Sequence, residues 1–150
     1  YQEVLTQALQ LLEQFPKSIN LYNILGAANK RLGNLEEAVE AYKKALSINP
    51  DYAEAYNNMG NVLQEQGKLE EAIEAFNKAL SVNPFNSPEY GKIAHIPGAQ
   101  RKSLAKAHLN KSFALLNNGQ LQQGLKEYEW RWEAKDSLSK RRDFLQPVWC

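Results

Sequence analysis

Apolar residues recur along most of this chain with the spacing of an amphipathic α-helix. Between Gly and Pro residues, they fall at i, i+3, i+4 and i+7, which places them on one face of a helix. Every segment with a clear period is of this kind, so the predicted fold class is all-α. The predicted helices span residues 2–14, 18–32, 35–48, 52–66, 69–82, 102–118 and 121–135.

The pattern repeats at a spacing of 34 residues. When residues 19–52 are laid over residues 53–86, Gly33 falls on Gly67 and the run Leu-Glu-Glu-Ala recurs. Other matched pairs are Tyr22 with Tyr56, Gly26 with Gly60, Ala38 with Ala72, Tyr42 with Phe76, Ala45 with Ala79 and Pro50 with Pro84. Each unit is therefore expected to have the same structure.

The matched residue types predict that structure. Gly33 and Gly67 suit the left-handed conformation that ends many helices. Pro50 and Pro84 end a second helix, because proline cannot continue one. Small alanines allow close helix approach, and a large aromatic residue fills the space between helices. Each unit is predicted to be a helix, a short turn and an antiparallel helix.

This set of residues resembles the tetratricopeptide repeat family. The resemblance implies a right-handed α-solenoid of antiparallel helix pairs that mediates protein–protein interaction and is not an enzyme. It divides residues 1–136 into the second helix of a partial repeat (1–18), two repeats (19–52 and 53–86), an insertion (87–104) and a divergent repeat (105–136). Residues 137–150 form a C-terminal tail.

The divergent repeat is placed by Gly119, which follows Gly67 at the repeat spacing plus an insertion of 18 residues. It departs from the family pattern at Lys111, Ser112, Gly124, Arg131 and Asp136. Because the cost of closing a loop rises slowly with its length, we expect this unit to stack on the one before it. Leu80 or Phe76 should then contact helix 102–118. Residues 85–101 are expected to be either a structured loop or a loop plus an early start to that helix.

Asparagines gather on the helix predicted over 52–66, although each is worse than Ala there by roughly 0.6 kcal/mol. In stacked repeats the first helices line a concave surface that binds partners. By resemblance, the residues of this surface include Asn20, Asn23, Lys30, Asn57, Asn58, Asn61, Lys106, Asn110 and Phe113. The partner would be a protein or peptide segment.

Two interpretations of the asparagines stay open. Asn58 and Asn110 share a repeat position, which resembles the asparagine ladder of O-GlcNAc transferase repeats, where amides hold a peptide backbone. Alternatively, the amides cap neighbouring helices or face solvent. The carboxylate clamp of chaperone-binding repeats fits poorly: Asn58 and Lys106 match it, but Asn23, Ala27 and Asn110 depart from it.

Signals for other chemistry are weak. His95 and His108 have no Cys, Ser or carboxylate partner at motif spacing, so neither catalysis nor a metal or cofactor is expected. Cys150 is a lone thiol, which fits a reducing, cytoplasmic location. No apolar run is long enough to cross a membrane. The formal net charge is +1, and the cations at residues 140–142 lack an RNA-binding motif, so nucleic acid is unlikely.

Two further hypotheses concern what lies beyond the repeats. Residues 128–132 and 147–149 resemble the last repeat of bacterial proteins with a downstream glycosyltransferase-like domain, so the repeats could be the recognition arm of a larger enzyme. The aromatic residues at 128–132 could instead be core or a docking surface. Helix 2–14 lacks its partner and has a wide apolar stripe, which predicts self-association through residues 1–15. We also expect that the sequence, which starts at Tyr1 within a repeat, continues a longer chain.

Overall fold

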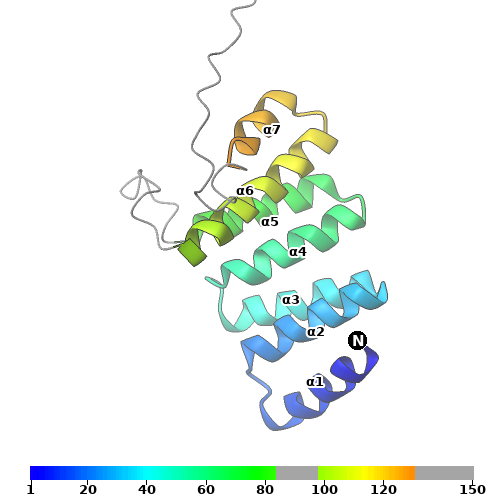
Figure 1. Cartoon of the computed structure of the whole chain (residues 1–150). Coiled ribbons are helices and arrows are strands. Elements are labelled where there is room, and N and C mark those ends of the chain that lie inside the picture. The colour runs from blue at the N-terminus through cyan, green and yellow to red at the C-terminus, as the bar shows by residue number, and fades with distance from the viewer. Residues whose placement is uncertain (84–97, 131–150) are drawn as a thin grey trace, which may run out of the picture.

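A computed structural model describes residues 1–83 and 98–130, which form seven α-helices (Figure 1). The first helix, α1, is unpaired, and three helix pairs follow it. The helices are α1 (Gln2–Gln14), α2 (Ile19–Leu32), α3 (Leu35–Ile48), α4 (Ala53–Glu65), α5 (Leu69–Ser81), α6 (Gly98–Asn117) and α7 (Leu121–Tyr128).

The helices stack in chain order as antiparallel neighbours (Figure 1). The pairs are α2 with α3, α4 with α5 and α6 with α7, and each pair also packs on the next. The α1 helix packs on α2. This arrangement confirms the all-α helical-repeat solenoid predicted from the sequence.

Each pair turns at a glycine with positive φ. Gly33, Gly67 and Gly119 have φ of +84°, +76° and +75°, a conformation that residues with a Cβ rarely adopt. In each case the glycine N–H donates to the carbonyl oxygen three residues earlier, at 3.1 Å. The divergent third pair therefore keeps the turn of the first two.

Within the first two pairs, a glycine of the first helix lies directly against an aromatic ring of the second. A Cβ at Gly26 would lie 2.5 Å from the Tyr42 ring, and a Cβ at Gly60 would lie 2.6 Å from the Phe76 ring. Both rings are almost completely buried. The helices can approach this closely only because these positions lack a side chain.

The third pair stacks on the second as expected. Leu80 of α5 forms a buried cluster with Leu104 and Ala107 of α6. Phe76 belongs to the main core cluster, which also includes Ala114 of α6. The prediction that Leu80 or Phe76 contacts the sixth helix is confirmed.

Two helix boundaries differ from the predicted ranges. The α6 helix begins at Gly98, before the predicted residue 102, which agrees with the alternative of an early start to this helix within residues 85–101. The α7 helix ends at Tyr128, and Glu129 and Trp130 form a turn that brings Trp130 back against α6. The rest of the predicted helix 121–135, the tail 137–150 and Pro84 lie outside the described residues.

Candidate functional site

The predicted binding residues all lie on the first helices of the three pairs. Asn20, Asn23 and Lys30 are on α2, Asn57, Asn58 and Asn61 on α4, and Lys106, Asn110 and Phe113 on α6. Asn20, Lys106 and Phe113 are exposed, and the other six are half-buried. The repeat alignment thus brings them together on three successive helices.

Four of the asparagines bond to each other across the junctions between pairs. Asn58 Nδ2 donates to Asn23 Oδ1 at 3.1 Å, and Asn110 Nδ2 donates to Asn57 Oδ1 at 3.1 Å. Asn23 and Asn57 share one repeat position, and Asn58 and Asn110 share the next. Two amide pairs at equivalent repeat positions therefore join α2 to α4 and α4 to α6.

At the first junction the amide network continues to an acid. Asn23 Nδ2 also donates to Glu54 Oε1 at 3.1 Å and to the Tyr52 hydroxyl at 3.3 Å, and that hydroxyl donates to Glu54 Oε2 at 3.1 Å. Burial and the nearby Glu54 carboxylate raise the pKa of Tyr52. The Glu54 carboxylate is therefore held by neighbouring donors.

These contacts bear on the two interpretations of the asparagines. Amides that hold neighbouring helices together are what the structural alternative requires, and Asn23, Asn57, Asn58 and Asn110 all make such contacts. Asn61 differs, since its amide has no hydrogen bond within residues 1–83 and 98–130. Lys30 pairs with Glu65 at 2.8 Å, which is a further bond between α2 and α4.

A hollow of about 340 Å³ lies between α4 and the beginning of α6, with residues at the end of α5 completing its wall. It brings together three of the predicted site residues, Asn57, Asn58 and Lys106. In the described part of the chain, no acidic side chain pairs with Lys106. The remaining lining residues are Ala53, Glu54, Ala79, Asn83, Lys102, Ser103 and Ala107.

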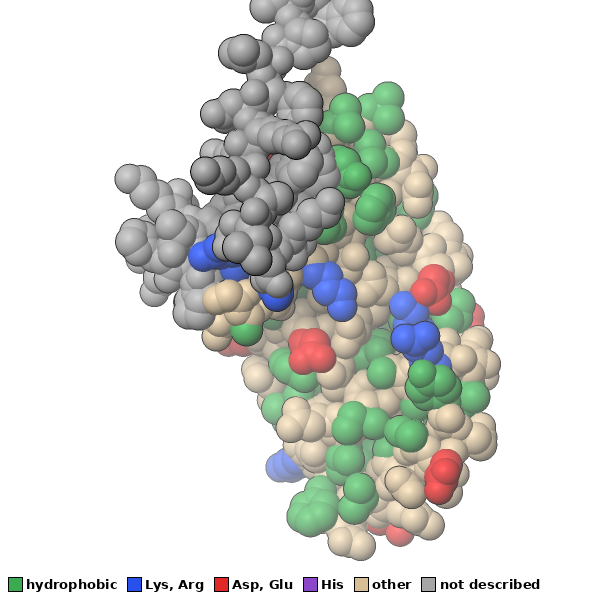
Figure 2. Space-filling view, viewed as in Figure 1, with side chains coloured by type: hydrophobic (Ala, Val, Ile, Leu, Met, Phe, Trp, Pro, Cys, Tyr) green, Lys and Arg blue, Asp and Glu red, His purple; other side chains and the backbone are tan. Residues whose placement is uncertain are grey.

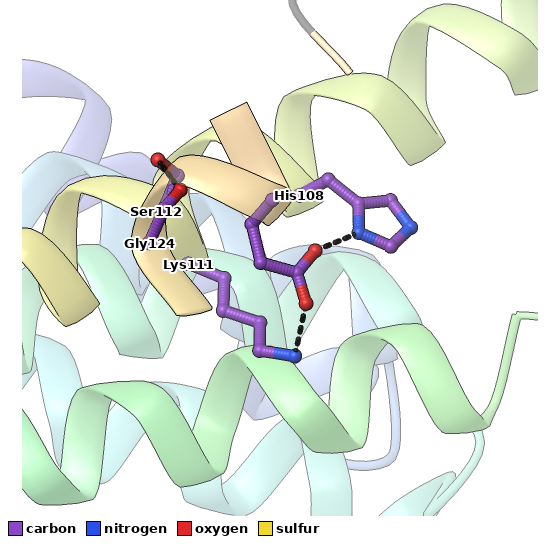
Figure 3. Close-up of polar contacts among 5 residues, drawn as sticks. His108, Lys111, Ser112 and Gly124 are labelled. Atoms are coloured by element: carbon purple, nitrogen blue, oxygen red, sulfur yellow. Dashed lines mark hydrogen bonds and ion pairs between the residues drawn. The ribbon is translucent and has the colours of Figure 1, made fainter. Parts of the chain in front are cut away.

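A second polar cluster, which sequence reasoning missed, lies between α6 and α7 (Figure 3). Glu127 accepts from Lys111 Nζ at 2.6 Å through one carboxylate oxygen, and the other lies 2.5 Å from His108 Nδ1. We call His108, Lys111 and Glu127 the α6–α7 ion cluster. His108 had no carboxylate partner at motif spacing in the sequence, but antiparallel pairing brings it to Glu127, 19 positions away. His95 lies outside the described residues.

Two departures of the third pair from the repeat pattern, Ser112 and Gly124, lie in contact with each other. Ser112 replaces the glycine of the first helix, and Gly124 replaces the alanine of the second. The buried Ser112 hydroxyl donates to the Gly124 carbonyl oxygen at 2.8 Å. A Cβ at Gly124 would lie 2.7 Å from the Leu116 side chain. In the third pair, therefore, the closely packed glycine is on the second helix and lies against Leu116 of the first.

Comparison with known families confirms the repeats. Residues 26–67 match the family model described as TPR repeat, and residues 53–86 match the model described as Tetratricopeptide repeat. No curated protein matches the sequence significantly. The repeats are thus shown for residues 26–86.

Solved structures share the fold. A crystal structure of MamA has a TM-score of 0.69 and 24% identity, covering 87% of this chain and 66% of its own. A second MamA structure has the same TM-score, 23% identity and coverages of 92% and 66%. The N-terminal domain of stress-induced protein-1 from C. elegans has a TM-score of 0.62 and 22% identity, covering 79% of this chain and 87% of its own. This chain therefore spans just under two thirds of the MamA chains.

These comparisons support the repeat fold alone. They give no support to the narrower resemblance to O-GlcNAc transferase repeats or to proteins with a glycosyltransferase-like domain, which stay hypotheses. No helix among the described residues is long and apolar enough to cross a membrane.

Proposed function

We propose that the chain is a protein-interaction scaffold whose concave face binds an extended segment of a partner protein at the hollow between α4 and α6. The observation that supports this most directly is the meeting of Asn57, Asn58 and Lys106 around one hollow of about 340 Å³. The repeat alignment selected these three residues independently of any pocket.

The hydrogen bonds within the protein determine what the two amides can still offer. Asn57 uses its Oδ1 to accept from Asn110, so its Nδ2 is left to donate. Asn58 uses its Nδ2 to donate to Asn23, so its Oδ1 is left to accept. A peptide unit presents one acceptor and one donor, which matches this pair.

Lys106 adds a positive charge at the rim of the hollow. Its ammonium group can donate to a backbone carbonyl or a carboxylate of the partner. Lys30 is less available for this purpose because Glu65 pairs with it. Lys106 is therefore the residue whose replacement should affect binding most with least effect on the fold.

The test begins with selection of peptides from a random displayed library against the whole chain, followed by calorimetric titration of a selected synthetic peptide. Lys106→Ala should weaken binding about tenfold or more, as expected for loss of a hydrogen bond from a charged group. Lys78→Ala removes the same charge from an exposed position on α5 outside the hollow, and should leave affinity unchanged. Equal effects of the two variants, or failure to select any peptide, would contradict the proposal.

A second candidate function, self-assembly through α1, is supported by the surface of that helix. Figure 2 shows hydrophobic side chains gathered at the end of the stack where α1 lies. Five of them are exposed by 41% or more: Tyr1, Val4, Leu9, Leu11 and Phe15. Apolar surface of this kind favours association with a second copy of the chain.

Sedimentation at increasing concentration tests this second candidate. Leu9→Glu should abolish concentration-dependent association, whereas Gln10→Glu, which adds the same charge at the next exposed position, should preserve it. If the wild-type chain sediments as a monomer throughout, residues 1–15 do not mediate self-association.

A further inference from the structure

The α6–α7 ion cluster occupies positions that are apolar in the other two pairs. At these positions the first pair has Tyr22, Leu25 and Ala41, the second has Tyr56, Met59 and Ala75, and the third has His108, Lys111 and Glu127. All three exchanges occur in one pair, and the new side chains touch one another. The third pair has therefore replaced part of an apolar contact with an ionic one.

Glu127 is at the centre of this contact. Its side chain is 18% exposed, and both carboxylate oxygens have cationic or imidazole partners on α6. The Trp130 ring stacks on His108, with centroids 4.0 Å apart and planes 3° from parallel. A carboxylate buried to this extent is costly without its partners, so its ionisation and the docking of α7 depend on each other.

Docking of α7 also fixes a residue of the concave face. Tyr128, which follows Glu127, contacts Phe113 edge-on with centroids 6.0 Å apart. Phe113 is 47% exposed and is one of the predicted binding residues. A shift of α7 would therefore release Phe113 from the ring that supports it.

We propose that Glu127 is a positioning residue that holds α7 on α6 and so holds Phe113 in place on the concave face. The importance of Phe113 for a partner rests on the proposed function, whereas the docking of α7 through Glu127 does not. The two ideas can therefore fail separately.

The arrangement makes the docking of α7 sensitive to acid. Among the described residues, the charged or titratable groups that face Glu127 are His108 and Lys111 of α6, while α5 contributes the apolar Leu80 to the adjoining core. Burial would raise the pKa of Glu127, but hydrogen bonds and charges from His108 and Lys111 outweigh it and lower that pKa below 4.5. A lowered pKa means that the stabilisation is present at neutral pH and is lost as the pH falls below about 4.5.

Amide hydrogen exchange, corrected for intrinsic rates, measures the docking directly. In the wild-type chain, protection of residues 121–128 should fall below about pH 4.5 before that of α2 to α5 does. Glu127→Gln should lower this protection roughly tenfold at neutral pH. The ring-proton NMR shifts of Phe113 should change with it, since they report the neighbouring Tyr128 ring.

Glu74→Gln is the matched control, because it removes one carboxylate from an exposed position in the middle of α5. It should leave the protection of α7 unchanged. If Glu127→Gln has wild-type protection in α7, or loses protection equally in all helices, the proposal is wrong.

A triple variant keeps the test decisive if Glu127→Gln does not fold. His108→Tyr, Lys111→Met and Glu127→Ala together install the residues of the second pair at the same three positions. Apolar replacement of a buried ionic group is often neutral or stabilising, so α7 should stay protected. Its protection should no longer change selectively below about pH 4.5. If the selective change persists in this variant, some other group is responsible and the proposal fails.

Discussion

The amide pair between α2 and α4 gives the sharpest test of why the asparagines are present. From the sequence alone, replacement of Asn58 and Asn61 by Ala should stabilise the helix at both sites, because Ala is better than Asn by roughly 0.6 kcal/mol. The structure separates the two residues. The Asn58 side chain donates to Asn23 at 3.1 Å, whereas the Asn61 side chain has no hydrogen bond in the described part of the chain.

The expected magnitudes follow from this difference. Asn61→Ala should gain about 0.6 kcal/mol of stability from helix propensity. Asn58→Ala should gain the same amount but lose a half-buried hydrogen bond worth about 0.5–1.5 kcal/mol. The free energy of unfolding should therefore differ between the variants by about 1 kcal/mol, or by about 3 °C in Tm for a chain of this size.

Urea denaturation and thermal melts of the two single variants measure this difference. The two sites lie three residues apart on α4, so they are compared within one helix. A double-mutant cycle with Asn23→Ala should recover a coupling energy of about 0.5–1.5 kcal/mol. If both variants are equally stabilised and the coupling is zero, the amide pair does not hold the helices together. In that case the asparagines would be retained for binding alone.

Two further changes test the packing within pairs. Gly60→Ala should be less stable than Gly98→Ala by about 1–3 kcal/mol in chemical denaturation. A Cβ at Gly60 would lie 2.6 Å from the Phe76 ring, whereas a Cβ at Gly98 would meet no atom within 4 Å. Equal stability of the two variants would mean that the ring moves freely. Burial raises the pKa of Tyr42, so stability should fall as the pH rises above about 10, and Tyr42→Phe should reduce that fall in alkaline melts.

The sequence predicted the solenoid well because each unit marks its own boundaries. Gly33 and Gly67 recur at the repeat spacing, and both turn out to have positive φ. The composition around Gly98 left two alternatives open, because a glycine at the first residue of a helix resembles one in a loop.

The contacts of the candidate site were less predictable. Asn58 bonds to Asn23, 35 residues earlier, and Asn110 bonds to Asn57, 53 residues earlier. Each separation is one residue more than the offset between the units concerned, so an alignment of equivalent positions does not pair them. Only the way successive helices lie against each other determines that an amide faces its neighbour and not solvent.

The ion cluster did leave a signal that could have been used. Lys111 departs from the repeat pattern, and His108 and Glu127 replace the aromatic residue and the alanine of the first two pairs. A cation and an acid that replace apolar residues on two antiparallel helices indicate a buried pair. Considered singly, the cation and the acid each resemble an ordinary surface charge.

The exchange between Ser112 and Gly124 limits how this chain can be recombined. In a chimera that joined α4 directly to α7, Glu127 would face Tyr56 and Met59 without a cation, and an unpaired buried charge costs about 3–5 kcal/mol. The Gly124 carbonyl oxygen would also lose the hydroxyl that now donates to it, because Gly60, at the position of Ser112, has no side chain. Exchange of α7 alone would therefore cost more than exchange of α6 and α7 together, so we expect these two helices to be inherited as a unit.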